Sequence, residues 1–182
     1  MKKISQVIII SFLLVFIAGC GKVTPRDAVD NFLSEYQNLS PTVIRDLDLV
    51  VSDEALTDTQ KEKYRSILKR EYETLEYFIL NEEYNDDVVS LEVKISVYDL
   101  YKVQKEASDY LNTYPLEFQD SNGEHNQELF MDYKLDMMQN TNQRVEYSIT
   151  FLTTKDENGN YEVIDVTESD LEKIHGIYMH ND

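Results

Sequence analysis

Three histidines are the side chains best suited to acid–base chemistry in this chain: His125, His175 and His180. A histidine transfers protons in catalysis only when the fold brings a nucleophile or a carboxylate to its ring. The sequence contains no G-x-S-x-G nucleophile elbow, no H-E-x-x-H pair and no glycine-rich phosphate loop. We therefore predict no catalytic residue, no metal site and no cofactor. The alternative is an active site assembled from residues that lie far apart in the chain.

The carboxylates are numerous, but they follow no metal-binding pattern. The segment Asp156–Asn160 resembles the start of a calcium loop, yet its glycine is the fourth residue instead of the sixth, and the twelfth position is Thr167 instead of Glu. A second acidic cluster, within residues 82–87, also surrounds a turn signal. We interpret both clusters as solvated charge at hairpin turns.

Cys20 is the only cysteine, so the chain has no internal disulfide and no C-x-x-C metal or redox pair. It follows a positively charged start (Met1–Lys3), an apolar run from Val7 to Ile17, and the small residues Ala18 and Gly19. This order of charged, apolar and small residues is typical of a secretory signal. The run is shorter than the roughly 20 apolar residues that a transmembrane helix needs.

The segment Ile17-Ala18-Gly19-Cys20 resembles the lipobox of bacterial lipoproteins. The resemblance implies that the Cys20 thiol receives a diacylglyceryl group and that residues 1–19 are removed as a signal peptide. The chain would then be anchored on the extracytoplasmic face of the cell membrane, with the lipid on Cys20 as its contact with the bilayer. Residues 20–23 would form a tether of at most about 14 Å. An ordinary secreted protein or an uncleaved anchor with an incidental cysteine is the alternative.

The net charge of the chain excludes one class of partner. The formal charge is −18, and removal of residues 1–19 would leave 15 basic residues against 35 acidic ones, a charge of −20. Such a surface repels phosphate backbones, so we expect no nucleic-acid partner. It also gains nothing from anionic lipid head groups, which means that membrane attachment would depend on the lipid.

The first part of the chain after the signal has helical spacing. Thr24-Pro25-Arg26-Asp27 is a helix start, and the helix is expected to end near Asn38. A weaker apolar stripe covers residues 43–51. A third helix is expected to begin near Thr57 to Thr59, with Thr59 and Glu62 in capping-box spacing. It carries five basic residues: Lys61, Lys63, Arg65, Lys69 and Arg70. We interpret them as a solvated surface, with a docking surface for an acidic partner or for lipid head groups as the alternative.

Beyond this helix the apolar residues alternate, as they do in strands. Residues 75–80 and 89–97 predict one hairpin, and residues 145–151 and 161–166 predict another around Asn158-Gly159. Two helices, near residues 103–111 and 129–138, separate the hairpins, and a short helix is expected to end at Ile174. The order ααα-ββ-αα-ββ predicts an α+β fold, a four-stranded antiparallel sheet with helices packed on one face, as a single domain over residues 24–182.

Three segments resemble small Gram-positive lipoproteins of unknown function: TPRDAVDNFLSEY (24–36), VKISVYDLYKVQKEASDYL (93–111) and DLEKIHGIYMH (170–180). Many proteins of this kind are assigned to the cystatin-like superfold that is shared with nuclear transport factor two. The resemblance implies a cone of helices over a curved antiparallel sheet. That superfold serves enzymes, ligand carriers and interaction modules, so the resemblance names no activity.

The aromatic composition is unusual, with 13 Tyr, 7 Phe and no Trp. Tyrosine buries an apolar ring while keeping one polar contact, which suits a pocket, an interface or a half-exposed sheet. We expect a membrane-anchored lipoprotein that binds an envelope protein or a small ligand. The alternative is an envelope enzyme whose active-site residues are scattered in the sequence. The length argues against a solute-binding component of a transporter, since such proteins usually have two larger lobes.

Overall fold

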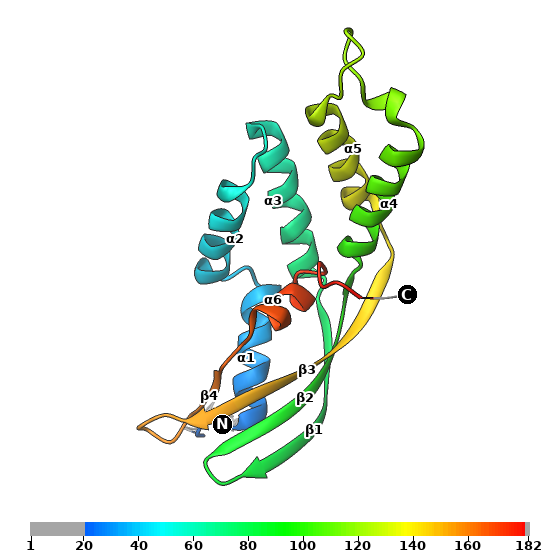
Figure 1. Cartoon of the computed structure of the whole chain (residues 1–182). Helices are drawn as coiled ribbons and strands as arrows, with labels where there is room; N and C mark the ends of the chain where they lie inside the picture. Colours follow the sequence, from blue (N-terminus) through cyan, green and yellow to red (C-terminus); the bar gives the residue numbers. More distant parts are fainter. Residues whose placement is uncertain (1–20, 181–182) are drawn as a thin grey trace, which may run out of the picture.

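The computed structural model describes residues 21–180, so the predictions for the signal peptide and for Cys20 lie outside it (Figure 1). The helices are α1 (Pro25–Gln37), α2 (Pro41–Asp53), α3 (Asp58–Glu73), α4 (Leu100–Thr113), η1 (Pro115–Phe118), α5 (Gln127–Asn140) and α6 (Glu168–Ile174). The strands are β1 (Glu76–Asn85), β2 (Val88–Tyr98), β3 (Arg144–Lys155) and β4 (Tyr161–Ile164). The α+β class and the order of elements are confirmed, and only the 3-10 helix η1 was not predicted.

Side-chain caps fix where the helices begin. The Thr24 hydroxyl accepts a hydrogen bond from the Asp27 amide, and the Asp27 carboxylate accepts one from the Thr24 amide, which completes a capping box at α1. At α3 the capping box is formed by Thr57 and Gln60. The prediction that Thr59 and Glu62 form the capping box was wrong by two residues. Thr57 and Thr59 are both followed three residues later by Gln or Glu, and this spacing alone does not choose between them.

The four strands form one antiparallel sheet in the order β1-β2-β3-β4. The alternation of β2 places five side chains that are 0 % exposed on one face of the sheet: Val89, Leu91, Val93, Ile95 and Val97. Their partners on β3 include Phe151 and Ile149, opposite Leu91 and Val93. Helices α1 and α6 cover this face, whereas the other face carries mostly polar exposed side chains together with the exposed Phe78 of β1. We call β1–β4 with α1 and α6 the sheet region.

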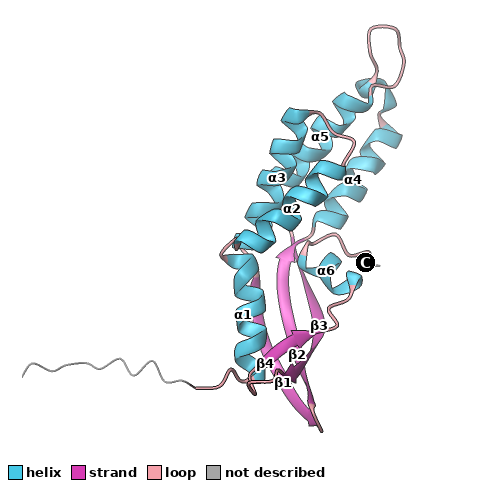
Figure 2. Cartoon of the chain, turned by 90° about the vertical axis from the view of Figure 1, so that its left-hand side faces the viewer, coloured by secondary structure: helices cyan, strands magenta, loops and turns pink. Residues whose placement is uncertain are grey.

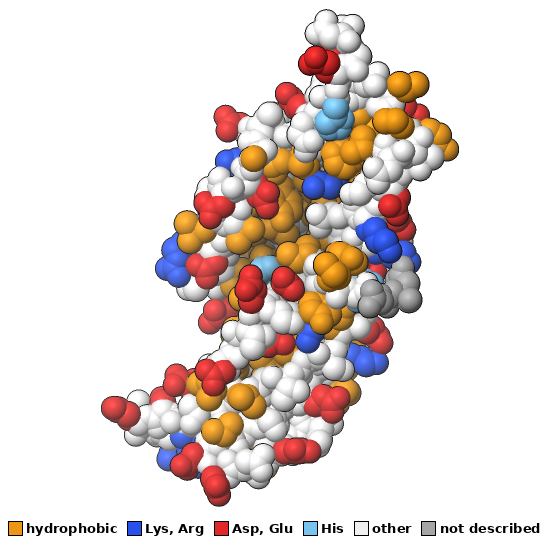
Figure 3. All heavy atoms as spheres, viewed as in Figure 1, with side chains coloured by type: hydrophobic (Ala, Val, Ile, Leu, Met, Phe, Trp, Pro, Cys, Tyr) orange, Lys and Arg blue, Asp and Glu red, His pale blue; other side chains and the backbone are white. Residues whose placement is uncertain are grey.

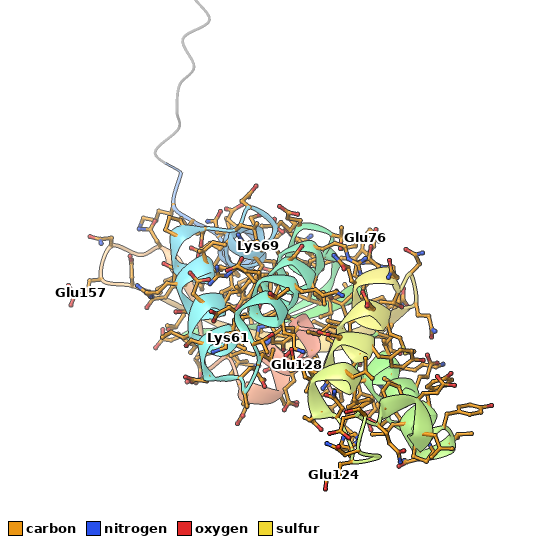
Figure 4. The ribbon with its side chains drawn as sticks, turned by 90° about the horizontal axis from the view of Figure 1, so that it is seen from above. Lys61, Lys69, Glu76, Glu124, Glu128 and Glu157 are labelled. Atoms are coloured by element: carbon orange, nitrogen blue, oxygen red, sulfur yellow. The ribbon has the colours of Figure 1, made fainter. Side chains whose placement is uncertain are left out.

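The remaining helices extend beyond the end of the sheet (Figure 2). Seen from above, they follow one another in the order α2, α3, α5, α4 (Figure 4), and each contacts its neighbour in that order. Their apolar stripes meet each other instead of the sheet, in a second core that includes Leu47, Ile67, Leu100 and Leu135. We call these four helices the helical layer. The prediction of helices packed on one face of the sheet therefore holds for α1 and α6. The helices of the helical layer pack against one another beyond the end of the sheet.

The two regions are joined where α6 ends. Gly176 lies in the left-handed region, with φ +68°, and a Cβ atom there would approach the backbone oxygen of Tyr98 to 2.2 Å. Both carboxylate oxygens of Glu71 accept a hydrogen bond from the Tyr98 amide, at 3.0 and 3.1 Å. Burial raises the pKa of Glu71 to about 8, even though the Tyr98 amide and the charges of Arg144 and Arg70 act in the opposite direction. This junction is therefore close-packed and sensitive to the loss of the Glu71 proton.

The described chain begins at the far end of the sheet region. The carbonyl of Val23 accepts a hydrogen bond from the Tyr161 amide at 3.0 Å, and the amide of Val23 donates one to the side chain of Asn160 at 3.2 Å. The N-terminal end of the described chain thus lies beside β4, whereas the loop between α4 and α5 is at the opposite end of the molecule (Figures 1 and 2).

Candidate functional groove

A groove opens in the helical layer between the α2–α3 tip and α4 (Figure 3). Its narrow part, of cavity volume about 50 Å³, is lined by Glu54, Leu56, Tyr64, Gln104, Met131, Lys134, Leu135 and Met138. Its wider and more open part, of about 410 Å³, shares Glu54, Tyr64 and Gln104 and continues to Tyr101, Lys105, Ser108 and Ile177. The shared residues make the two parts one continuous groove, which ends at the C-terminal segment after α6.

The floor of the groove is rigid because polar contacts hold α3 to α5. The buried side chain of Gln60 donates hydrogen bonds to the Glu128 carbonyl at 3.1 Å and to the Asp132 carboxylate at 2.8 Å. Near the other end of α3, Arg70 donates to the carbonyls of Met138 and Thr141. The N-terminal end of α3 thus contacts the N-terminal end of α5, and the C-terminal ends of the two helices also meet. The helices α3 and α5 are therefore parallel.

The basic residues of α3 mostly serve this packing. Lys63 pairs with Asp136 of α5, and the Nε atom of Arg65 lies 3.0 Å from the carboxylate of Asp48 on α2. Lys61 donates to the carbonyl of Ser52 at 2.8 Å. The interpretation as a merely solvated surface was therefore incomplete, because these cations tie neighbouring helices together.

Three polar groups of the narrow part lack partners among the described residues. Lys134, half-buried on α5, forms no ion pair or hydrogen bond within residues 21–180, and neither do the Tyr64 hydroxyl and the Gln104 amide. Burial lowers the pKa of Lys134, while the charge of Glu54 acts in the opposite direction. Burial also raises the pKa of Tyr64 to about 12, so its hydroxyl stays protonated. The groove therefore presents an ammonium, a phenol and an amide above an apolar floor.

Two of the histidines lie away from any reactive partner. His125 is exposed in the loop before α5, with its Nε2 atom 3.2 Å from the Gln127 side chain. His175 caps the end of α6, and its ring lies 5.5 Å from that of Tyr72. Burial lowers the pKa of His175 to about 4, so this ring is neutral.

The third histidine belongs to a carboxylate–imidazole–phenol chain. The Nε2 atom of His180 lies 3.3 Å from the carboxylate of Asp99, and its Nδ1 atom lies 3.2 Å from the Tyr147 hydroxyl. Asp99 and Tyr147 are only 5 % and 8 % exposed. Burial raises the pKa of Tyr147, so its hydroxyl is a poor nucleophile. The arrangement holds the C-terminal segment against the sheet and the start of α4.

The acidic turns behave as the sequence predicted. The Asp156 carboxylate accepts hydrogen bonds from the amides of Asn158 and Asn160, both at 2.8 Å, and closes the turn before β4. These amide contacts lower the pKa of Asp156. Within residues 21–180, no three His, Cys, Asp or Glu side chains gather as a metal-binding group.

Scans against protein-family models, curated proteins and solved structures found no match to this chain. Among the helices of the described residues, none is long and apolar enough to cross a membrane. The resemblance to small lipoproteins and to the cystatin-like superfold therefore stays a prediction.

Sequence reasoning did not single out any residue of the groove. Lys134 lies within the segment whose apolar spacing predicted a helix near residues 129–138. A lysine between the apolar positions of such a helix is normally an exposed surface residue, so the sequence alone gave no reason to single it out. A signal was nevertheless present, because Met131, Leu135 and Met138 lie on one face of α5 and Lys134 flanks that face.

Proposed function

We propose that this protein is a lipid-anchored binding domain on the extracytoplasmic face of a bacterial membrane, and that it binds an envelope protein through the groove of the helical layer. The observation that carries the proposal is the groove itself, with three unpaired polar groups above an apolar floor. The three groups are half-buried and border open space, where a partner that covers the groove can reach them.

A protein partner is favoured over a small ligand by the open form of the groove. The narrow part, of about 50 Å³, is too small to enclose a ligand by itself, and the wider part, whose 410 Å³ lies within the roughly 300–1,000 Å³ of small-ligand pockets, is open instead of enclosing. The space under α1 and α6, where a cone would hold a ligand, is filled by the side chains of the sheet core. The open wider part of the groove suits a body that covers it from outside.

The position of the anchor supports the same proposal. A lipid on Cys20 would be three residues from Val23, which is bound beside β4. The helical layer lies at the other end of the molecule (Figure 2). A chain anchored in this way would hold its sheet region next to the bilayer and present its groove to the envelope.

Two experiments test the proposal. Cys20→Ala should abolish labelling of the chain by radioactive palmitate in a bacterial host, and undiminished labelling would refute the anchor. For the groove, Ser108→Trp would fill its wider part, and Thr150→Trp would place the same group on the exposed face of β3. Chemical crosslinking of whole cells should give a partner adduct with the wild type and Thr150→Trp but not with Ser108→Trp. An adduct that persists with Ser108→Trp would refute binding through the groove.

A further inference from the structure

The narrow part of the groove contains an ammonium group without a counter-ion. Lys134 is half-buried on α5, and within residues 21–180 no carboxylate lies within ion-pair distance of it. The charge of Glu54 acts on it from the α2–α3 side without forming an ion pair. An ammonium that is partly desolvated and unpaired costs free energy in the unbound protein, and an anion placed beside it removes that cost.

Two neutral groups complete the environment of this charge. The Tyr64 hydroxyl and the Gln104 amide line the same narrow space, and both can donate a hydrogen bond. A carboxylate has two oxygens and about four lone-pair sites, so one carboxylate can accept from all three groups. The apolar floor of Met131, Leu135 and Met138 would contact the methylene groups that carry the carboxylate.

We propose that the narrow part of the groove is a carboxylate site, in which Lys134, Tyr64 and Gln104 receive an Asp or Glu side chain of the protein partner. This inference depends on the proposed function and adds the chemistry of recognition to it. The cavity volume of about 50 Å³ is of the size of a side-chain carboxylate with its methylene groups, and the wider part of the groove leaves room for the rest of the partner. Glu54 is exposed on the opposite wall of the groove, where it could pair with a cationic side chain of the same partner. The two opposite charges, Lys134 and Glu54, would then fix the orientation of the partner in the groove.

Butyrate is a direct probe, with 1-butanol and butylamine as uncharged and oppositely charged controls. The full chain, processed in a bacterial host and held in lipid nanodiscs, would carry ¹³C-labelled methionine methyl groups. Met131 and Met138 line the site, and Met179, which is 69 % exposed, serves as the reference. Butyrate should shift the Met131 and Met138 signals saturably and leave Met179 unchanged, whereas the two controls should not saturate.

Lys134→Met removes the charge and keeps most of the side-chain volume. It should weaken butyrate binding at least about tenfold, as expected for the loss of a charge-assisted hydrogen bond. The matched variant Lys69→Met, on the surface of α3 (Figure 4), should bind as the wild type does. Equal binding by Lys134→Met, or shifts by 1-butanol as large as those by butyrate, would overturn the carboxylate site.

Failure of this inference can be distinguished from failure of the proposed function. If Ser108→Trp abolishes the partner adduct while Lys134→Met leaves both the adduct and butyrate binding unchanged, the groove binds a partner by another chemistry. If neither variant affects the adduct, the groove is not the binding surface at all.

Discussion

The sheet region and the helical layer differ in the half-buried polar groups at the surface of their cores. On the covered face of the sheet, five successive inward residues of β2 are 0 % exposed, and the buried Thr153 hydroxyl donates a hydrogen bond to the Val89 carbonyl. In the helical layer, Lys134 and Tyr64 are partly buried without partners among the described residues. Under the proposed function, the sheet region serves stability, while the helical layer retains unpaired groups that a partner would meet.

The largest effect is expected where the two regions meet. Gly176→Ala should destabilise the fold by more than about 3 kcal/mol, because the new Cβ would meet the Tyr98 backbone oxygen at 2.2 Å in a left-handed conformation. Gly123→Ala is the matched control, since Gly123 is also left-handed but its Cβ would meet only the Gln119 side chain, at 3.9 Å. It should cost about 1–2 kcal/mol. Urea unfolding measures both, and equal losses would refute the close junction.

A truncation in each region tests the comparison itself. Ile95→Ala in the sheet core should cost about 3 kcal/mol, because its side chain is 0 % exposed and leaves a cavity. Met131→Ala at the groove should cost about 1 kcal/mol or less, because the side chain borders open space. Urea unfolding of both variants would give the two values. Comparable losses would mean that the groove residues are core residues.

A pH effect comes from the junction. Burial raises the pKa of Glu71 from 4.5 to about 8, so the folded protein keeps a proton that the unfolded chain releases, and stability falls as the pH rises across that window. The pKa of His175, lowered from 6.5 to about 4, acts in the opposite direction between those values. Between pH 6.5 and 8, the effect of Glu71 is therefore the larger of the two.

The unfolding free energy should fall by about 1 kcal/mol between pH 6.5 and 8, because Glu71 loses its proton in the folded protein only toward the upper end of this range. Glu71→Gln should abolish this fall, while Glu73→Gln, at an exposed position of the same helix, should keep it. Urea unfolding across the pH range tests the pair. A fall that persists in Glu71→Gln would contradict the account of the junction.

The smallest effect is expected at the groove. Lys134→Met should change the unfolding free energy by no more than about 0.5 kcal/mol, because its ammonium has no partner to lose among the described residues. Lys63→Met, which loses the pair with Asp136, should cost up to about 1 kcal/mol. Thermal unfolding of both variants is sufficient. A larger loss in Lys134→Met than in Lys63→Met would assign Lys134 to stability instead of recognition.

Local patterns predicted the elements well and their arrangement less well. The alternation from Val89 to Val97 predicted both the strand and its buried face, because a strand has a period of two. The Thr24–Asp27 box marked a helix start, because it satisfies orphan amides through neighbours in sequence.

The groove depends on contacts that no local pattern contains. Gln60 meets Asp132 across 72 residues, and only that pairing makes α3 and α5 parallel neighbours. Lys134 becomes notable only after α3 and α4 bring Tyr64 and Gln104 beside it. Similarly, the polar segment around His125 pointed to an exposed loop, but only the packing against Tyr72 reveals that the environment of His175 keeps its ring neutral.

The most direct test of the account is site-specific photo-crosslinking in living cells. Benzoylphenylalanine would replace Leu56 at the mouth of the groove in one strain and Ser148, on the exposed face of β3, in another. The account predicts that irradiation gives a discrete adduct with an envelope protein from position 56 and none from position 148. An adduct from position 148 with none from position 56 would contradict it and move the binding surface to the sheet region.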